Sequence, residues 1–226
     1  MRCFFFSLFL TYTLAEQRPR GEEQRKKERR DLLPHSPRKK YKTERKMEMR
    51  QEEGELDLLE QPSTLTDKDV VMIQESWIKV YENHMDNGAA ILMRFFTDFP
   101  SSMKFFKDFK HIERIEELQN NDKLKKHGER VMNLINDVIV NLYNSEKVAL
   151  VLNGLGKSHA LRHHVEPIYF KILSGVILTV LKEAFSEVVT SEVAAAWTKL
   201  LANLYSAVKA AYDEVGWIKG SASTSK

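Results

Sequence analysis

Helix-breaking residues are scarce after residue 63, and this scarcity limits what the chain can fold into more than any other feature. Pro167 is the only proline between Ser101 and Lys226, and apolar residues recur at steps of three and four. Such steps place apolar side chains on one face of a helix, whereas a half-buried strand needs alternation at every second residue, which no stretch sustains. The sequence therefore predicts an all-α body.

Composition sets the number of domains and excludes one class of metal site. The chain has 226 residues, of which 42% are hydrophobic and 30% charged, which suits one domain with a buried core and a tail. Cys3 is the only cysteine, so an intrachain disulfide and a thiolate metal cluster are both excluded, and a reducing compartment is indicated. The net charge of +3 comes from a basic N-terminal head, because the body is near neutral.

The N-terminal head has two parts. Residues 3–15 form an apolar run that looks like a signal sequence but is too short to span a bilayer comfortably, so we predict no transmembrane anchor. Residues 16–62 are highly charged and poor in apolar side chains; their basic blocks fit a nuclear address, a patch for an anionic surface or, more simply, a solvated tail. We predict a disordered extension over 1–62, a helical domain over 63–217 and a short flexible tail over 218–226.

Two helix boundaries can be assigned from local chemistry. Thr66 begins the segment TDKD, in which a hydroxyl cap is followed by an acid at the third helical position. The first helix should run from there to about Asn83, and the second should stop near Pro100, whose nitrogen cannot donate to the preceding turn. The side chains that we expect in the core are Val70, Ile73, Trp77, Val80, Ile91, Phe95, Phe96, Trp197, Tyr205 and Tyr212.

Two histidines interrupt apolar stripes. His127 lies within the stripe Leu124, His127, Val131, Leu134, Val138 and Leu142, and His159 lies within the stripe Val148, Leu152, Leu155 and His159, which His163 continues. A single histidine on an apolar face is usually a core residue with a backbone or water partner. Two of them on separate stripes indicate a metal held between two imidazoles.

Two other metal sites compete with this interpretation. A zinc site would use His159, His163 and a third ligand, but the body has no HExxH pattern and no cysteine. A di-iron bundle would need Glu-x-x-His motifs on facing helices, and the nearest helical candidate, Glu129, is followed by Met132 instead.

Four segments of the body resemble the vertebrate globins. They are FFKDFKH, LKKHGERVM, GKSHALRHHVEPIYFKILSGVIL and AAYDEVGW, and they place His127 and His159 32 positions apart, as in that family. The similarity spans residues 63–217 and is greatest to the cytoglobin branch. It implies a globin fold, in which helices A to H surround haem b, the iron protoporphyrin IX cofactor.

The resemblance also implies a role for each matching side chain. His159 takes the position of the proximal iron ligand, and His127 that of the distal residue, which in cytoglobin-like members also ligates iron when no gas is bound. The remaining positions would be plain core or surface without this register. They are Phe106 on the porphyrin face, Phe109 in the pocket wall, Leu92 and Val131 in the distal pocket, Arg130 and His163 at the propionates, and Val165 and Phe170 on the proximal wall.

The implied function is gated binding of O2, NO and CO with redox chemistry. The resemblance implies a haem-dependent oxidoreductase, with His127 as the catalytic residue and with nitric oxide dioxygenase, nitrite reductase, peroxidase or superoxide-removing activity. An external electron donor would then re-reduce the iron. The alternative is a reversible protein for oxygen storage, transport or sensing. We expect a cytoplasmic and also nuclear location, a monomer or homodimer, and no nucleic-acid partner.

Two features depart from the family's pattern. Many mammalian cytoglobins have two cysteines whose disulfide adjusts the distal histidine, and the matching positions here hold His84 and Glu129, so ligand kinetics should not respond to thiol reductants. The family's N-terminal tail is also short and begins much as this chain does from Met47. We therefore hypothesise that residues 1–46 come from an alternative or incorrectly assigned start.

Overall fold

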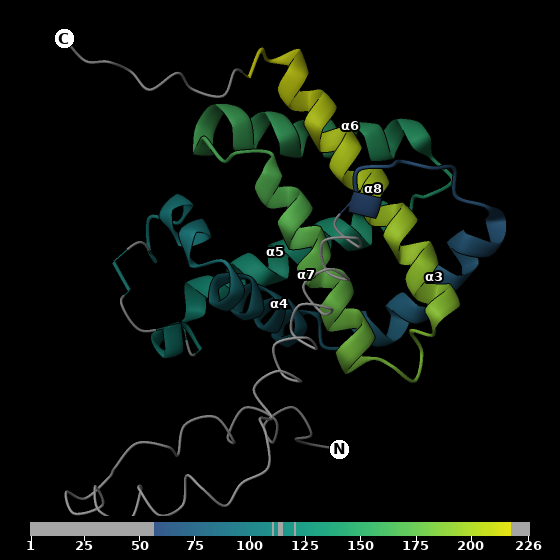
Figure 1. Ribbon diagram of the computed structural model, residues 1–226, viewed down its shortest axis with the longest axis horizontal. Helices are drawn as coiled ribbons and strands as arrows, with labels where there is room; N and C mark the ends of the chain where they lie inside the picture. The colour runs from purple at the N-terminus through teal and green to yellow at the C-terminus, as the bar shows by residue number, and fades with distance from the viewer. Residues whose placement is uncertain (1–56, 110, 113–114, 120, 218–226) are drawn as a thin grey trace, which may run out of the picture. The chain divides into compact units, whose positions relative to one another are not determined.

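The computed structural model describes residues 57–109, 111–112, 115–119 and 121–217, and these residues are helical without any strand (Figure 1). This confirms the predicted all-α class. The expected signal-like run and C-terminal tail lie outside the described residues. The helices are α3 (Asp67–Tyr81), α4 (His84–Asp98), η1 (Pro100–Phe105), η2 (Ile115–Leu118), α5 (Asp122–Ile139), α6 (Ser145–Ser158), η3 (His159–His163), α7 (Ile168–Ala184) and α8 (Ser191–Glu214).

A capping box begins α3 at the predicted residue. The Thr66 hydroxyl accepts from the Asp69 backbone N–H at 3.1 Å, and the Asp69 carboxylate accepts from the Thr66 backbone N–H at 2.8 Å. Lys199 of α8 donates to the same carboxylate at 2.9 Å, which ties the first helix to the last. These bonds, led by that from Lys199, lower the pKa of Asp69 to about 2.

Two glycines let α4 and α5 cross in close contact. A Cβ built on Gly88 would lie 2.5 Å from the Gly128 carbonyl oxygen, so neither position has room for a side chain. The crossing also decides which face of α5 is buried most deeply. That face contains Leu124, Gly128, Met132, Ile135, Val138 and Ile139. Of the predicted stripe, Leu124 and Val138 are therefore buried, whereas His127, Val131, Leu134 and Leu142 are half-buried.

The core lies between α3, α4, α5, α7 and α8, and α6 crosses α8 (Figure 1). Every side chain expected there is buried, including Trp77, Trp197, Tyr205 and Tyr212. The indole of Trp77 donates to Asn136 and that of Trp197 to Ser76, both at 3.0 Å, so each buried N–H has an acceptor.

Residues 57–62, which the sequence placed in the N-terminal extension, contact the helical domain. Leu59 is fully buried in the core, and the Glu60 carboxylate lies 2.8 Å from the ammonium of the buried Lys171 on α7. Ser63 and Asn203 of α8 exchange two hydrogen bonds. The ordered domain therefore begins earlier than residue 63. None of the helices in the described ranges is both long and apolar enough to cross a membrane.

Candidate functional site

His127 lies half-buried in the first half of α5, beneath aromatic rings from the segment after η1. Asn121 caps this helix through bonds to the backbone N–H groups of Lys123 and Leu124. The edge of the Phe106 ring lies against the imidazole, with ring centres 5.0 Å apart, and Phe109 stacks on Phe106 at 5.5 Å. His127 directly precedes Gly128, which lies at the α4–α5 crossing, so this crossing fixes the position of His127 relative to α4.

Arg130 determines which nitrogen of His127 carries the proton in this arrangement. Its Nη2 lies 3.1 Å from His127 Nδ1. A guanidinium can only donate, so Nδ1 accepts and the proton of the neutral ring is on Nε2. In this form the Nε2 of His127 can donate a hydrogen bond, and its lone pair becomes free for a metal only when Arg130 releases Nδ1.

His159 lies where α6 gives way to a wider turn. The π-helical turn η3 follows Ser158 and ends at His163. It is capped by His164, whose φ of 51° is left-handed, and the carbonyl of His159 accepts from the backbone N–H groups of His164 and Val165. His159 Nδ1 donates to the Leu155 carbonyl at 2.9 Å, which leaves Nε2 unprotonated in the neutral ring. This is the tautomer that a metal ligand requires.

Both histidines are neutral at physiological pH. Burial, together with electrostatic repulsion of a protonated ring by Arg130, His159 and His163, lowers the pKa of His127 to about 4. Burial also lowers the pKa of His159, although its bond to Leu155 opposes the shift. The neutral imidazole is the form in which histidine binds iron, zinc or copper.

The other predicted site residues fall into two groups around these rings. On the side of His159, the Phe170 ring lies edge-on at 5.1 Å and the exposed His163 ring at 5.4 Å, and Val165 accepts a bond from Tyr212 through its carbonyl. On the side of His127, Phe106, Phe109 and Arg130 are close together as described above. Leu92 is buried on α4, and Val131 is half-buried one turn beyond His127.

The described residues contain no cluster of three or more His, Cys, Asp or Glu side chains that could hold a metal. The zinc alternative, which required a third ligand beside His159 and His163, therefore has no support in the part of the chain that the structure covers. A haem iron would need no third side-chain ligand, because the porphyrin supplies its other ligands.

Sequence comparison identifies the group of proteins that share this arrangement. The family model described as Globin matches residues 89–208. The chain belongs to the globin family. It is 57% identical to Cytoglobin-1 of Oryzias latipes over 177 residues, which is 78% of this chain and 100% of that protein. It is 48% identical to Cytoglobin-2 of Danio rerio, over 78% of this chain and 99% of that protein, and 45% identical to Cytoglobin-1 of Danio rerio, over 73% and 95%.

The side chains of this globin fit the cofactor that its family binds. Globins hold haem and bind diatomic gases at its iron, so membership extends both ligand classes to this domain. The His159 ring has its Nδ1 bonded to a carbonyl and its Nε2 free, which is the donor that a haem iron takes. The rings of Phe106 and Phe170 lie beside the two histidines and are of the apolar, aromatic kind that packs against a porphyrin face.

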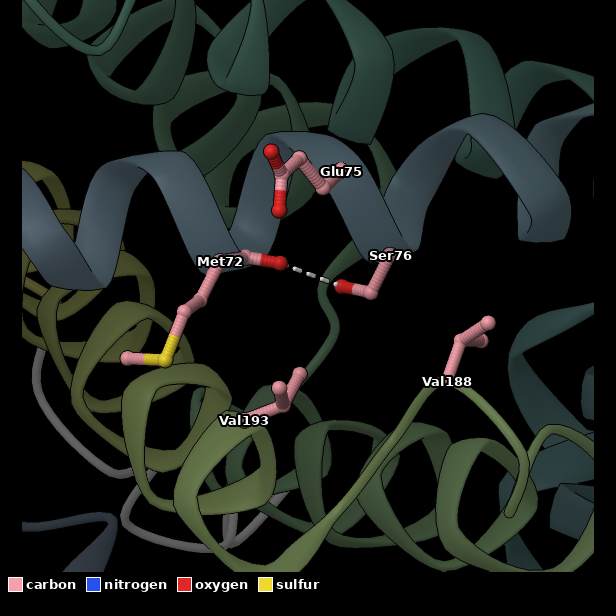
Figure 2. A pocket seen from close by; sticks show the side chains of 5 residues that line it. All are labelled: Met72, Glu75, Ser76, Val188 and Val193. Carbon is pink, nitrogen blue, oxygen red and sulfur yellow. Dashed lines mark hydrogen bonds between the residues drawn. The ribbon is translucent and has the colours of Figure 1, made fainter.

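A hollow lies between α3, the connection from α7 to α8 and the start of α8, and none of the predicted site residues lines it. Figure 2 shows the side chains around it, which are Met72, Glu75, Ser76, Val188 and Val193, and its volume is about 190 Å³. The Ser76 hydroxyl bonds to the Met72 carbonyl at 2.8 Å and accepts from the Trp197 indole. The buried hydroxyl is therefore already satisfied, and we assign no ligand to this hollow.

Several residues that support the site had no signal in the sequence reasoning. Leu155 was expected only as part of an apolar stripe, yet its carbonyl orients His159. Tyr212 was expected in the core, where it lies, and its hydroxyl also holds the Val165 carbonyl at 2.8 Å. An exposed turn followed by Pro167 could have indicated the segment that Tyr212 fastens, but not which atom it holds.

Proposed function

We propose that this globin binds haem b between His159 and His127 and uses it for redox chemistry on small molecules. The observation that carries the proposal is the pair of half-buried, neutral imidazoles, of which His159 presents a free Nε2 oriented by Leu155. In this proposal His159 is the permanent ligand. His127 is the exchangeable sixth ligand and the residue that faces an incoming gas.

Bound haem would supply the iron at which O2, NO or CO binds and electrons are exchanged. His159 would hold the cofactor through Nε2, because the Leu155 carbonyl keeps the proton of the ring on Nδ1. His127 would compete with the gas, so the apparent affinity would equal the intrinsic affinity multiplied by the fraction of molecules in which His127 is released. After release, Arg130 can occupy Nδ1 and leave a proton on Nε2, from which His127 can donate to a polar ligand.

The remaining pocket residues would shape this space. Leu92 and Val131 would limit the size of the ligand, Phe106 and Phe109 would cover the distal side, and Val165 and Phe170 the proximal side. Arg130 and His163, both exposed, are suited to pair with the propionates by charge-assisted hydrogen bonds. For Arg130 this pairing would compete with its bond to His127.

A gated site of this kind suits redox work more than rapid gas exchange. We propose nitric oxide dioxygenase, nitrite reductase, peroxidase and superoxide-removing activities, all of low turnover and all dependent on an external electron donor. We further propose a cytoplasmic and also nuclear protein that acts as a monomer or homodimer. The second candidate function is reversible oxygen storage, transport or sensing, which the Nε2 proton of His127 also favours because it can stabilise bound dioxygen.

Absorption spectra of the haem-loaded protein test the ligand set. Low-spin ferric and ferrous spectra are expected for the wild type, and His127→Leu should convert them to high-spin spectra with haem still bound. His159→Ala should abolish stable haem uptake. A wild-type protein that is already high-spin would overturn the six-coordinate proposal, and unchanged haem uptake in His159→Ala would overturn the site.

A reaction of the ferrous oxygenated protein with NO distinguishes the two functions. The oxidoreductase should form nitrate over many turnovers when a cellular reductant is supplied. An oxygen storage protein should form one equivalent of nitrate and then stop, because nothing returns its iron to the ferrous state.

A further inference from the structure

A series of aromatic rings leads from the proposed iron ligand to the surface of the domain. The His159 ring contacts Phe170 at 5.1 Å between ring centres, Phe170 contacts Tyr212 at 6.2 Å, and Tyr212 contacts Trp217 at 5.4 Å. Each step is an edge-on contact within the usual range for aromatic pairs. The last ring lies nearly parallel to the exposed His164 ring at 6.4 Å.

Tyr212 can pass an electron toward the haem, but its oxidised form should be short-lived. Its side chain is 1% exposed, and its hydroxyl donates to the Val165 carbonyl at 2.8 Å. Burial raises the pKa of this phenol, and a carbonyl is too weak a base to take its proton. An oxidised phenol is strongly acidic and becomes long-lived only when its proton leaves. An oxidised Tyr212 should therefore take an electron from a neighbouring ring, which moves the positive charge to that ring.

Trp217 is the neighbouring ring that is suited to remain in the oxidised form. It is half-buried after the end of α8, where Gly216 with a φ of 67° turns the chain back so that the Trp217 backbone N–H reaches the Tyr212 carbonyl at 3.0 Å. Its indole Nε1 is buried and has no acceptor among the described residues. An oxidised indole can persist as a cation with its proton retained, and part of this ring is open to solvent.

The series of rings on the His127 side of the site is less suited to carry electrons. From His127 it passes through Phe106, Phe96 and Phe95 before it reaches Tyr169, so three successive rings are phenylalanines, which resist oxidation. The Lys104 ammonium lies 5.5 Å from the centre of the Tyr169 ring, and its positive charge opposes the formation of a second positive charge there.

We propose that Trp217 is a surface oxidation site, at which a phenolic one-electron reductant delivers electrons through Tyr212 and Phe170 toward the haem when a hydroperoxide reacts there. This inference depends on the proposed haem site and names the reductant class for its peroxidase activity. One hydrogen peroxide takes up two electrons and two protons and leaves as two waters. Two phenols each give one electron at Trp217 and release one proton, and each becomes a phenoxyl radical.

The test uses the full-length ferric, haem-loaded protein, which is mixed with hydrogen peroxide and frozen before the radical decays. Electron paramagnetic resonance should show a tryptophan-type radical that falls by about tenfold in Trp217→Phe, which keeps a ring against Tyr212 and removes the oxidisable indole. The matched control is Tyr169→Phe, which should leave the signal within about twofold of wild type. Oxidation of a phenol linked to a polymer too large to enter the domain should follow the same pattern.

Peptide mass spectrometry of the peroxide-treated wild type gives a reading that does not depend on any variant. It should find oxidised Trp217 and far less oxidation of Tyr169. A radical that survives in Trp217→Phe, or one lost in Tyr169→Phe, would overturn the proposed route, as would oxidation mapped to Tyr169 in place of Trp217. A protein that shows no haem spectrum would instead overturn the proposed function, so the two failures can be told apart.

Discussion

Arg130 controls a choice between two states of His127. In the structure its guanidinium donates to Nδ1, so the Nε2 of the neutral ring keeps its proton and can donate a hydrogen bond. Iron ligation by the same Nε2 needs the opposite tautomer, with the proton on Nδ1. The hydrogen bond from Arg130 would therefore oppose the proposed six-coordinate state and favour the state in which a gas can bind.

Replacing Arg130 should shift that balance. Arg130→Met is expected to raise the six-coordinate fraction and to lower the apparent affinity for CO by about threefold or more, because a charge-assisted hydrogen bond favouring the open state is lost. The matched control is Lys126→Met, which removes an exposed charge from the same helix. The ferrous absorption spectrum and the CO association rate measure the two quantities. An unchanged or higher CO affinity in Arg130→Met would contradict this role.

At this scale the sequence located the two histidines but not the chemistry of their rings. A titratable ring in an apolar stripe is conspicuous, and His127 and His159 were found in that way. The partners of their Nδ1 atoms were not predictable, because they depend on a rotamer of Arg130 and on a backbone carbonyl at Leu155. Hydropathy carries no information on either.

Among the helices, the α4–α5 crossing is the contact least able to absorb a change. A methyl group on Gly128 would meet backbone atoms of Gly88 and Ala89 at 2.5–2.6 Å, so the two helices would have to separate. Gly128→Ala is therefore expected to lower the free energy of unfolding by about 3 kcal/mol or more. Urea unfolding followed by circular dichroism measures the loss. Haem binding should also be weaker in this variant, because separation of the two helices would displace the adjacent His127.

Gly154 provides a matched control for this prediction. It also lies inside a helix, α6, but nothing lies within 4 Å of a Cβ built on it. Gly154→Ala should raise the free energy of unfolding by up to about 1 kcal/mol, because alanine loses less backbone entropy in a helix. Equal effects at the two glycines would show that helix propensity, and not the crossing, determines the result.

Asp69 links the start of α3 to α8 in a way that depends on pH. Its pKa of about 2 in the folded protein is below the ordinary value of 3.8, so the unfolded chain binds the proton more tightly. The carboxylate therefore stabilises the fold above pH 3.8, and that contribution is lost as the pH falls toward 2. Asp69→Asn should reduce the free energy of unfolding by about 2 kcal/mol at pH 7.

Unfolding measurements across pH test this assignment. The difference between wild type and Asp69→Asn should shrink as the pH falls below 3.8. Glu75→Gln, at an exposed position on the same helix, is the control and should change little. A difference that persists undiminished in acid would mean that the carboxylate's charge is not what stabilises the helix pair.

Helix boundaries were predictable where a side chain caps the backbone, and less so where packing decides. The capping box at Thr66 was found from TDKD, and the second helix ends at Asp98, close to the expected stop near Pro100. The most buried face of α5 matches the predicted stripe only in part, because Gly88 and Gly128, which carry little hydropathy, bring α4 and α5 into close contact. The π-helical turn at His159 likewise arises from the sharp return after His164 and not from periodicity.

At the scale of the whole molecule, residues 57–62 and the proximal wall of the site belong to one packed unit. The sequence placed these residues in a disordered extension because their neighbours are highly charged and their apolar content is low. The structure buries Leu59 completely and pairs Glu60 with Lys171, whose side chain is only 10% exposed. Lys171 directly follows Phe170, whose ring contacts His159.

Loss of this segment should therefore weaken both the fold and the haem site. Leu59→Ala is expected to cost about 2–4 kcal/mol of unfolding free energy, whereas Leu58→Ala, at a side chain that is 52% exposed, should cost about 0.5 kcal/mol or less. Deletion of residues 1–62 should lower stability further, because it also leaves the Lys171 ammonium without the Glu60 carboxylate in a buried position.

Adding Lys171→Met to that deletion separates the two causes. Methionine fills a similar volume without a charge, so the double variant should recover part of the lost stability although it regains no contact with Glu60. Haem dissociation should be faster in the deletion variant and slower again in the double variant, since the neighbouring Phe170 would regain a firmly packed helix. Two results would contradict a stabilising role for residues 57–62. One is an equal loss of unfolding free energy in Leu58→Ala and Leu59→Ala, and the other is no recovery of stability on adding Lys171→Met.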